Sequence, residues 1–430
     1  MCGKGARILF NVRELFFWGL DWLKGSPVKS KMYILQEKKK KAYDNQDDLV
    51  ALLNYVRKNV PFYKEIISDK LVDFPVISKE LIKTKYAQFR SDEYTDDTKL
   101  LTVFTSGSSG TPFKAYQTAE KNDYHKAALI LKNKEIGWQI GDRWAHLRNW
   151  GFGAPASKLR CLKQNMVPLS ILDLDDQKLE HIVQTLLHDK RLQIILSYSS
   201  GLERLAEYIV RKNYVDADFG IKLIIADSDN LKTEVWDLLE QIFRCPVLNR
   251  YASIENDIIA ITKPGDRTFY IDTTQFYVEV LKMDEDVSVE EGEMGRIVVT
   301  DFHNKAMSFV RYANGDLAIA KKIVNGQCVE FGALEGRAIS ALRKTDGTLL
   351  SETNIMGRFK QFVEIHRYQI IQTGTKDYTM RLEGATTAVD EKCIAEVKKI
   401  FGSDANVSIQ HTDRIECGPN GKFRVTISKL

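Results

Sequence analysis

The stretch Thr-Ser-Gly-Ser-Ser-Gly-Thr-Pro at residues 105–112 decides how the rest of this sequence is interpreted. Its glycines allow backbone N–H groups to approach an anion closely, and its hydroxyls donate further hydrogen bonds, so the composition suits the phosphates of a nucleotide. Such loops also serve as plain linkers, but this one follows an apolar, strand-like run at residues 100–104. A phosphate-binding loop is therefore favoured. Its expected donors are Thr105, Ser106, Gly107, Ser108, Ser109, Gly110 and Thr111.

The loop lacks the signatures of other common phosphate and nucleophile motifs. A P-loop requires Gly-Lys followed by Ser or Thr, and the two Gly-Lys pairs of this chain are followed by Gly5 and Phe423. The G-x-S-x-G pattern of a hydrolase nucleophile is also missing from the loop. A nucleotide hydrolase or kinase that uses this loop is therefore the less favoured alternative.

Downstream of the loop, the pattern of apolar residues predicts an α/β fold. Strand-like runs at residues 192–196, 222–226 and 246–251 alternate with segments of helical spacing, which is typical of a parallel sheet with crossover helices. After about residue 266, β-rich runs joined by Asp, Glu and Gly turns indicate a barrel-like β subdomain. The last ninety or so residues read as a small α+β unit. We expect two domains, at residues 1–337 and 338–430.

The overall composition is that of an ordinary soluble globular protein, with 44% hydrophobic and 28% charged residues. The 62 basic and 58 acidic residues give a net charge of only +4, so no nucleic-acid partner is expected. The six cysteines are scattered without a C-x-x-C pair, which argues against a disulfide framework or a structural zinc site.

An apolar and aromatic segment at residues 8–23 raises the question of membrane contact. Arg13, Glu14, Asp21 and the absence of a small-residue cleavage site argue against a signal peptide or a membrane span. We expect the segment to pack on the protein, with a membrane-surface helix as the alternative. No transmembrane segment is expected, and the expected location is the cytoplasm.

The loop resembles the phosphate-binding loop of the adenylate-forming superfamily, which includes acyl-CoA synthetases, peptide-synthetase adenylation domains and luciferases. Further segments follow in the order and at roughly the distances of that family's motifs. They are Tyr251-Ala252-Ser253-Ile254-Glu255, Arg311-Tyr312-Ala313-Asn314-Gly315-Asp316, Gly336-Arg337 and Gly421-Lys422-Phe423-Arg424. Each alone is weak, since an exposed Gly-Asp is usually a turn and a Tyr is usually packing. Together and in order they carry the resemblance.

The resemblance implies a role for each matching residue. Tyr251 would lie against the adenine, and Glu255 would hold Mg²⁺ as a catalytic residue. Asp316 would accept hydrogen bonds from the ribose hydroxyls, and Arg337 would contact the ribose just before the hinge. Lys422 would be the catalytic lysine, because a compact ammonium can neutralise charge on the α-phosphate and the attacking carboxylate together.

The sequence is closest to the branch containing phenylacetate–CoA ligase and the CapK-type proteins of capsule and surface-polysaccharide gene clusters. The residues that point to this branch are 59–63 (NVPFY), 198–205 (YSSGLERL) and 307–316 (MSFVRYANGD). The resemblance implies a large N-terminal domain and a small mobile C-terminal one, with ATP and Mg²⁺ required. It also implies an AMP-forming ligase that makes an acyl-adenylate from a small carboxylic acid. The acyl group would pass to CoA, another thiol or an amine.

Two departures from the family pattern bear on function. Ile254 stands where the family has a hydroxyl residue before the glutamate, and Ala338-Ile339-Ser340 stands where it has an aspartate just after Gly-Arg. The second change affects the expected hinge and leaves CoA, a free amine or a sugar-linked amine open as the acceptor. A non-catalytic ATP-binding relative is the remaining alternative.

The substrate pocket is expected between the two domains. Its expected residues are Gly151, Gly153, Tyr198 and Ser200, and Arg148, Lys158 and Arg160 would suit a second anionic group on the acid. The identity of the acid, the acceptor and the oligomeric state stay open.

Overall fold

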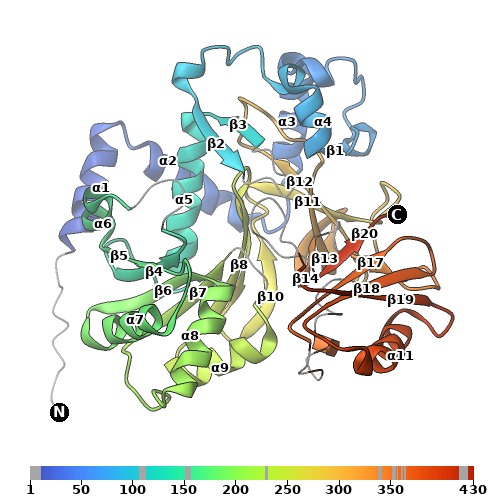
Figure 1. The fold of residues 1–430 in the computed structure, drawn as a ribbon. Coiled ribbons are helices and arrows are strands. Elements are labelled where there is room, and N and C mark those ends of the chain that lie inside the picture. Colours follow the sequence, from blue (N-terminus) through green and yellow to red (C-terminus); the bar gives the residue numbers. More distant parts are fainter. Residues whose placement is uncertain are drawn as a thin grey trace.

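The computed structural model describes most of the chain, as two lobes that lie side by side (Figure 1). The described residues are 11–105, 113–150, 156–227, 231–337, 341–350, 355, 357–359, 362, 365–415 and 425–430. The larger lobe is built on one long mixed sheet, and the smaller, C-terminal lobe has its own sheet. This arrangement confirms the predicted α/β class.

Five parallel strands form the first half of the large sheet, in the order β5-β4-β6-β7-β8. They are β4 (Arg143–Arg148), β5 (Met166–Ser170), β6 (Leu192–Tyr198), β7 (Leu223–Asp227) and β8 (Val247–Ser253). One face is covered by α7 (Asp176–His188), α8 (Ser199–Arg211) and α9 (Thr233–Phe243). The strand-like runs predicted at 192–196, 222–226 and 246–251 are strands β6, β7 and β8.

The opposite face of these strands carries a second apolar cluster. It includes Trp144, Leu196, Ile225 and Leu248, with Cys161 of α6 (Lys158–Gln164) packed against it. Successive side chains of a strand point to opposite faces, so side chains two positions apart point to the same face. The residues two positions after Trp144, Leu196, Ile225 and Leu248 therefore also lie on this second face.

Antiparallel strands continue the same sheet beyond β8 rather than forming a separate sheet. They are β9 (Asp257–Lys263), β10 (Asp266–Ile271), β11 (Phe276–Leu281), β12 (Met294–Asp301), β13 (Tyr312–Val324) and β14 (Gln327–Arg337). The order continues β8-β9-β10-β14-β13-β12-β11. The last strand, β11, also packs on β14, so this half of the sheet curls around its own core. The curl accounts for the predicted barrel-like character.

The N-terminal third caps the large lobe. Its helices are α1 (Val12–Leu23), α2 (Pro27–Lys40), α3 (Gln46–Asn59), α4 (Lys79–Thr84) and α5 (Ala119–Glu135), with short strands β1 (Ile77–Ser78), β2 (Leu101–Thr105) and β3 (Phe113–Gln117). Strands β2 and β3 pair antiparallel up to Thr105 and Phe113, so residues 106–112 connect two paired strands. These connecting residues lie outside the described part of the chain.

A buried arginine connects this N-terminal third to the sheet through hydrogen bonds. Arg311 is 2% exposed, and its guanidinium binds both carboxylate oxygens of Glu279 on β11, at 2.9 and 3.0 Å. The same side chain donates to the carbonyl of Phe74, at 3.0 Å. Arg311 therefore has a structural position, although it opens the segment that resembles the ribose-binding motif.

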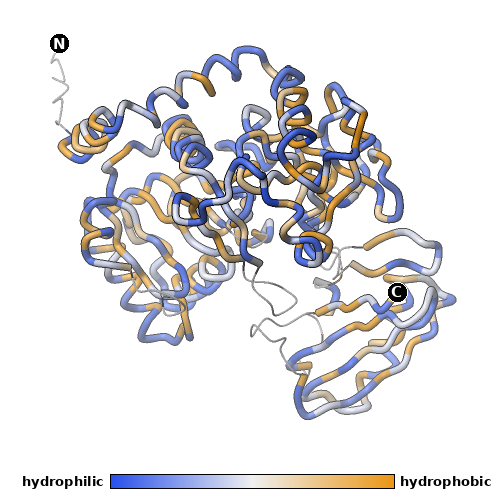
Figure 2. The backbone as a smooth tube through the Cα atoms, turned by 90° about the horizontal axis from the view of Figure 1, so that it is seen from above, coloured by the Kyte–Doolittle hydropathy of each residue, from blue (hydrophilic) through white to orange (hydrophobic). Residues whose placement is uncertain are grey.

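The C-terminal lobe is a small α+β unit, and Figure 2 shows it set beside the large lobe. Its elements are β15 (Leu342–Arg343), β16 (Leu349–Leu350), β17 (Arg367–Gln372), β18 (Asp377–Glu383), α11 (Asp390–Phe401), β19 (Asn406–Thr412) and β20 (Thr426–Ser428). Four strands form a sheet in the order β19-β18-β17-β20. Helix α11 is followed directly by Gly402, whose positive φ of 134° suits glycine.

Candidate functional site

The side chains of three expected ATP-binding residues meet, one each from strands β8, β13 and β14. The Tyr251 hydroxyl donates to Asp316 Oδ2 at 2.8 Å, and Arg337 Nε lies 2.8 Å from Asp316 Oδ1. Asn314 Nδ2 donates to the Tyr251 hydroxyl at 2.6 Å, so the tyrosine oxygen both donates and accepts. One carboxylate is thus held by a phenol on one side and a guanidinium on the other.

Local backbone structure explains why these side chains converge. Asp316 and Arg337 are cross-strand partners on β13 and β14, so their side chains fall on the same face of the sheet. Gly315 has a φ of +88°, which a side-chain-bearing residue rarely adopts. The Asp316 N–H donates to Asn314 Oδ1 at 3.0 Å and closes this turn of backbone.

Burial keeps Tyr251 in its neutral form. The side chain is 8% exposed, and desolvation together with the charge of Asp316 raises the pKa of Tyr251 well above its usual value. Its ring packs edge-on against Phe331, with 6.1 Å between ring centroids. Tyr251 is therefore a fixed, protonated donor rather than a titrating group.

Glu255, the expected magnesium ligand, lies in the turn between β8 and β9. It is 7% exposed, and its Oε1 accepts a hydrogen bond from the Tyr312 hydroxyl at 2.9 Å. The preceding residue, Ile254, is 49% exposed, so the missing hydroxyl of the family motif is replaced by an outward-facing apolar side chain. Mg²⁺ at ATP sites is commonly held by one or two carboxylates together with phosphates and water, and Glu255 fits that pattern.

Lys79, which belongs to none of the matching motifs, also lies near this site. It opens helix α4, and burial lowers its pKa, although the charge of nearby Glu255 acts in the opposite direction. Arg337 is also close enough to affect it. No pattern in the sequence distinguishes Lys79 from other lysines, because it is the packing of α4 beside the β1 and β13 pair that brings it here.

A buried ionic network fixes the far end of the same turn. Lys121 on α5 is fully buried, with its Nζ 2.7 Å from Asp301 Oδ2 and 3.5 Å from Asp257 Oδ2. His125 Nδ1 lies 3.4 Å from the other oxygen of Asp257. Because Asp257 begins β9 two residues after Glu255, these contacts help to hold the turn in place.

Near their carboxyl ends, the parallel strands carry polar residues that lie side by side in one row across the sheet. The registers pair Ser170 with Arg148, Tyr198 with Asp227, and Asp227 with Arg250. In open α/β sheets the carboxyl edge is the usual ligand-binding edge. The expected pocket residue Tyr198 belongs to this row, whereas Ser200 is exposed in the first turn of α8.

This row of strand-end residues carries positive charge on the sheet face that also carries Trp144. Arg250 forms an ion pair with Asp227 at 2.7 Å, but Arg148 has no ion pair with any described residue. The Arg148 guanidinium stacks over the ring of Trp150, at 5.1 Å. Burial, followed by the charges of Arg148 and Arg250, lowers the pKa of His146 to about 3, so this histidine is neutral.

Several expected site residues lie outside the described part of the chain. They are Ser106, Gly107, Ser108, Ser109, Gly110, Thr111, Gly151, Gly153 and Lys422. Thr105 ends β2, and of its side chain nothing is described. The described residues contain no group of three or more His, Cys, Asp or Glu side chains placed to hold a metal ion.

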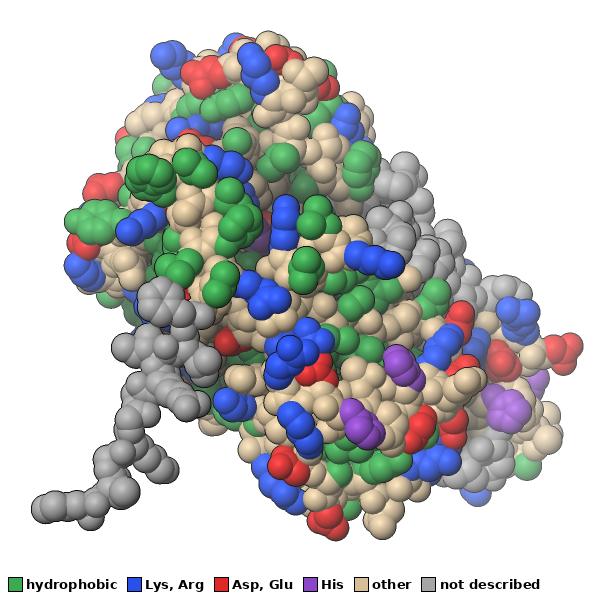
Figure 3. Space-filling model, turned by 90° about the vertical axis from the view of Figure 1, so that its left-hand side faces the viewer, with side chains coloured by type: hydrophobic (Ala, Val, Ile, Leu, Met, Phe, Trp, Pro, Cys, Tyr) green, Lys and Arg blue, Asp and Glu red, His purple; other side chains and the backbone are tan. Residues whose placement is uncertain are grey.

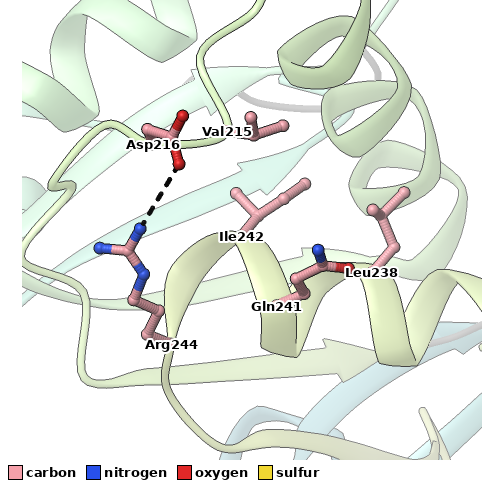
Figure 4. Close-up of a pocket in the computed structure, with 6 residues that line it drawn as sticks. All are labelled: Val215, Asp216, Leu238, Gln241, Ile242 and Arg244. Atoms are coloured by element: carbon pink, nitrogen blue, oxygen red, sulfur yellow. Dashed lines mark ion pairs between the residues drawn. The ribbon is translucent and has the colours of Figure 1, made fainter.

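A small hollow elsewhere on the large lobe does not belong to this site. It measures about 210 Å³ and lies between Val215, Asp216, Leu238, Gln241, Ile242 and Arg244 (Figure 4). These residues precede β7 and β8, so the hollow is at the amino edge of the parallel strands, opposite the polar row. Its volume is below the roughly 300–1,000 Å³ usual for small-molecule sites.

Comparison with known sequences relates the chain to CapK. Residues 342–429 match the family model of the CapK C-terminal domain. Protein CapK of Staphylococcus aureus is 23% identical over 415 residues, which cover 88% of this chain and 87% of that protein. Both matches agree with the branch that the sequence motifs indicate.

Comparison with solved structures relates the fold to adenylate-forming CoA ligases. A 2-hydroxyisobutyryl-CoA ligase in an open conformation with 2-HIB-AMP and CoA aligns with a TM-score of 0.60 and 16% identity, over 89% of this chain and 90% of that one. The O-succinylbenzoate CoA synthetase of Bacillus subtilis, in complex with AMP, aligns with a TM-score of 0.54 and 13% identity, over 75% and 67%. The chain therefore has the adenylate-forming ligase fold.

Proposed function

We propose, from an adenylate-forming fold that ends in a CapK-type domain, that this protein is an AMP-forming ligase. It would activate a carboxylic acid with ATP and transfer the acyl group to a thiol or an amine. The observation that carries the proposal is the junction of Tyr251, Asp316 and Arg337 beside Glu255. These four matching residues come from three separate segments of the sequence and converge in space.

In the first half-reaction, a carboxylate oxygen attacks the α-phosphorus of ATP, and the bond to the β-phosphate breaks to release pyrophosphate. The two reactants are both anions, so the enzyme must supply positive charge and positioning rather than a nucleophile. Asp316 would bind the ribose hydroxyls, Tyr251 would lie against the adenine, and residues 105–111 would hold the phosphates. Mg²⁺, held by Glu255, would supply charge neutralisation when bound.

Lys422 would supply the remaining positive charge in this step. The large lobe offers Arg337 and Lys79 near Glu255, but Arg337 already pairs with Asp316, and burial lowers the pKa of Lys79 and so disfavours its charged form. We therefore assign the charge at the α-phosphate to Lys422, which would arrive with a mobile C-terminal domain that begins after Arg337.

In the second half-reaction, a thiol or amine attacks the acyl carbon, AMP leaves, and the attacking group loses its proton. Solved proteins of this fold are named CoA ligases, which supports CoA as the acceptor. The absence of an aspartate at 338–340 favours an amine, including one on a sugar. The resemblance to CapK-type proteins supports a role in surface-polysaccharide biosynthesis, and the need for ATP supports a cytoplasmic site of action.

The polar row at the carboxyl edge supports an acid with a second anionic group. Arg148 lies three strands from β8, which at the usual strand spacing is about 14 Å. The reacting carboxylate must meet the α-phosphate near Glu255, just after β8, so Arg148 is too far away to bind it. A partly buried arginine at that distance, with no ion pair to a described residue, suits a carboxylate or phosphate at the other end of the substrate.

An ATP–pyrophosphate exchange screen tests the proposal directly. With Mg²⁺ present, at least one carboxylic acid should support exchange of labelled pyrophosphate into ATP. ATP binding without exchange for any acid in a broad panel would favour a non-catalytic relative, and ATP hydrolysis to ADP would favour the hydrolase or kinase alternative.

A further inference from the structure

Helix α1 turns its apolar side chains outward. Its exposed large residues are Val12, Leu15, Phe16, Leu20, Trp22 and Leu23, with exposed fractions from 42% to 72%. Its polar residues Arg13, Glu14 and Asp21 lie on the inner side, where buried Asp21 accepts hydrogen bonds from the first N–H groups of α2. At 100° per residue, the outward apolar face spans about 160° of the helix.

The inner side of α1 explains how the helix stays attached to the protein. Phe17 and Trp18 pack on a cluster formed by α2 and α5, as the sequence predicted for this segment. The usual amphipathic arrangement is therefore reversed, because a surface helix normally presents its polar face to water. An exposed apolar face of this size indicates an interaction surface.

Helix α6 extends the same surface. Arg13 Nε donates to the carbonyl of Leu162 at 3.3 Å, which places the start of α1 beside the end of α6. On α6, Leu159 and Leu162 are 61% and 65% exposed. We call these two leucines and the six exposed residues of α1 the α1–α6 face. Figure 3 shows hydrophobic side chains grouped with Lys and Arg on this side of the molecule.

Exposed cations without an ion-pair partner among the described residues lie on and beside the helices of the α1–α6 face. The exposed basic residues at the end of α1, in the first turn of α2 and in α6 are Lys24, Lys29, Lys158, Arg160 and Lys163. None of the five forms an ion pair with a described residue. The two acidic residues of α1, Glu14 and Asp21, are not exposed. The surface thus combines an apolar centre with a positive rim.

We propose that the α1–α6 face docks on an anionic membrane surface. Aromatic and aliphatic side chains would enter the headgroup region, and the lysines and arginine would contact lipid phosphates, as in other interfacial helices. A second copy of this chain is disfavoured, because a symmetric contact would place the positive rim of one copy against that of the other. Helix α1, with 12 residues, is too short to span a bilayer, which takes about 20.

Vesicle sedimentation with the full chain tests this proposal. The protein should bind vesicles of phosphatidylglycerol and phosphatidylcholine, and bind phosphatidylcholine alone at least about tenfold more weakly. Phe16→Ser with Trp22→Ser should lower binding to the anionic vesicles at least about tenfold. A triple variant should show weaker binding to the anionic vesicles only, and that binding should depend less on salt. The variant combines Lys24→Gln, Lys158→Gln and Lys163→Gln.

The matched control replaces exposed apolar residues elsewhere on the large lobe. Ile67 and Val72 are 92% and 70% exposed, so Ile67→Ser with Val72→Ser should leave vesicle binding unchanged. The proposal fails if the unmodified protein binds neither kind of vesicle, or if the Phe16 and Trp22 substitutions leave vesicle binding unchanged. It also fails if those substitutions convert a dimer into a monomer without any vesicle binding, because a second copy would then cover the face.

Discussion

Asp316 and Arg337 face each other across β13 and β14, and Arg337 Nε lies 2.8 Å from Asp316 Oδ1. Tyr251 holds the other oxygen of the same carboxylate, at 2.8 Å. The carboxylate is therefore oriented before any ligand arrives. Arg337 is followed directly by residues 338–340 and then by the C-terminal lobe, so the proposed ribose contact and the proposed hinge are neighbours in the chain.

The first prediction is that ATP binding depends on Asp316. Asp316→Ala should weaken ATP binding, measured by calorimetry, by more than about 1 kcal/mol, because a charge-assisted hydrogen bond to the ribose is lost. Asp316→Asn is the matched control for shape, since it retains an oxygen that can accept from Tyr251. If Asp316→Ala folds normally and binds ATP as before, Asp316 has no place in the site.

A second prediction separates structure from function within the segment 311–316. Arg311→Met leaves Glu279 buried without its cation, so the free energy of unfolding should fall by about 3 to 5 kcal/mol in denaturant titration. Replacing Glu279 with Met as well should recover much of that loss. The ATP affinity of the folded double variant should match that of the unmodified protein, and a large loss of affinity would place Arg311 in the nucleotide site after all.

The third prediction concerns the acid. Arg148→Gln should raise KM for a dicarboxylic acid at least about tenfold in the exchange assay, while the weaker reaction with the monocarboxylic acid of equal length stays unchanged. Lys163→Gln is the control, because Lys163 is an exposed cation of α6. A preference for monocarboxylic acids in the unmodified enzyme would contradict a second anionic group, whereas exchange with no acid would contradict the ligase itself.

A fourth prediction addresses the acceptor. If an amine takes the acyl group, CoA should leave the rate of AMP release unaltered in the presence of an exchanging acid, and a suitable amine should accelerate it. Mass spectrometry of the product identifies the acceptor. Rapid formation of an acyl-CoA would instead establish the CoA-ligase reaction.

Strands β6 and β7 were predictable because runs of apolar residues fill both of their faces, whereas β4 was not. In β4, Arg143, His146 and Arg148 interrupt the apolar pattern, and their positions make sense only once the edge of the sheet is seen. The convergence of Tyr251, Asp316 and Arg337 agrees with the order of the motifs, but Lys79 reaches the site through tertiary packing alone. Similarly, the sequence shows that α1 is apolar but not that its apolar face points outward.

The last prediction assigns the charge needed in the first half-reaction to Lys422. Removing an electrostatic group that acts chiefly in the transition state costs on the order of 100-fold or more in rate and spares ground-state binding. Lys422→Ala should therefore retain ATP affinity in calorimetry but lose pyrophosphate exchange. A preformed adenylate no longer needs that charge, so the variant should still transfer the acyl group from synthetic acyl-AMP at close to the normal rate. Lys429→Ala, which removes another lysine of the C-terminal segment, is the matched control and should behave normally in both half-reactions. Normal exchange by Lys422→Ala, or an equal loss in both half-reactions of a folded variant, would make Lys422 a structural residue.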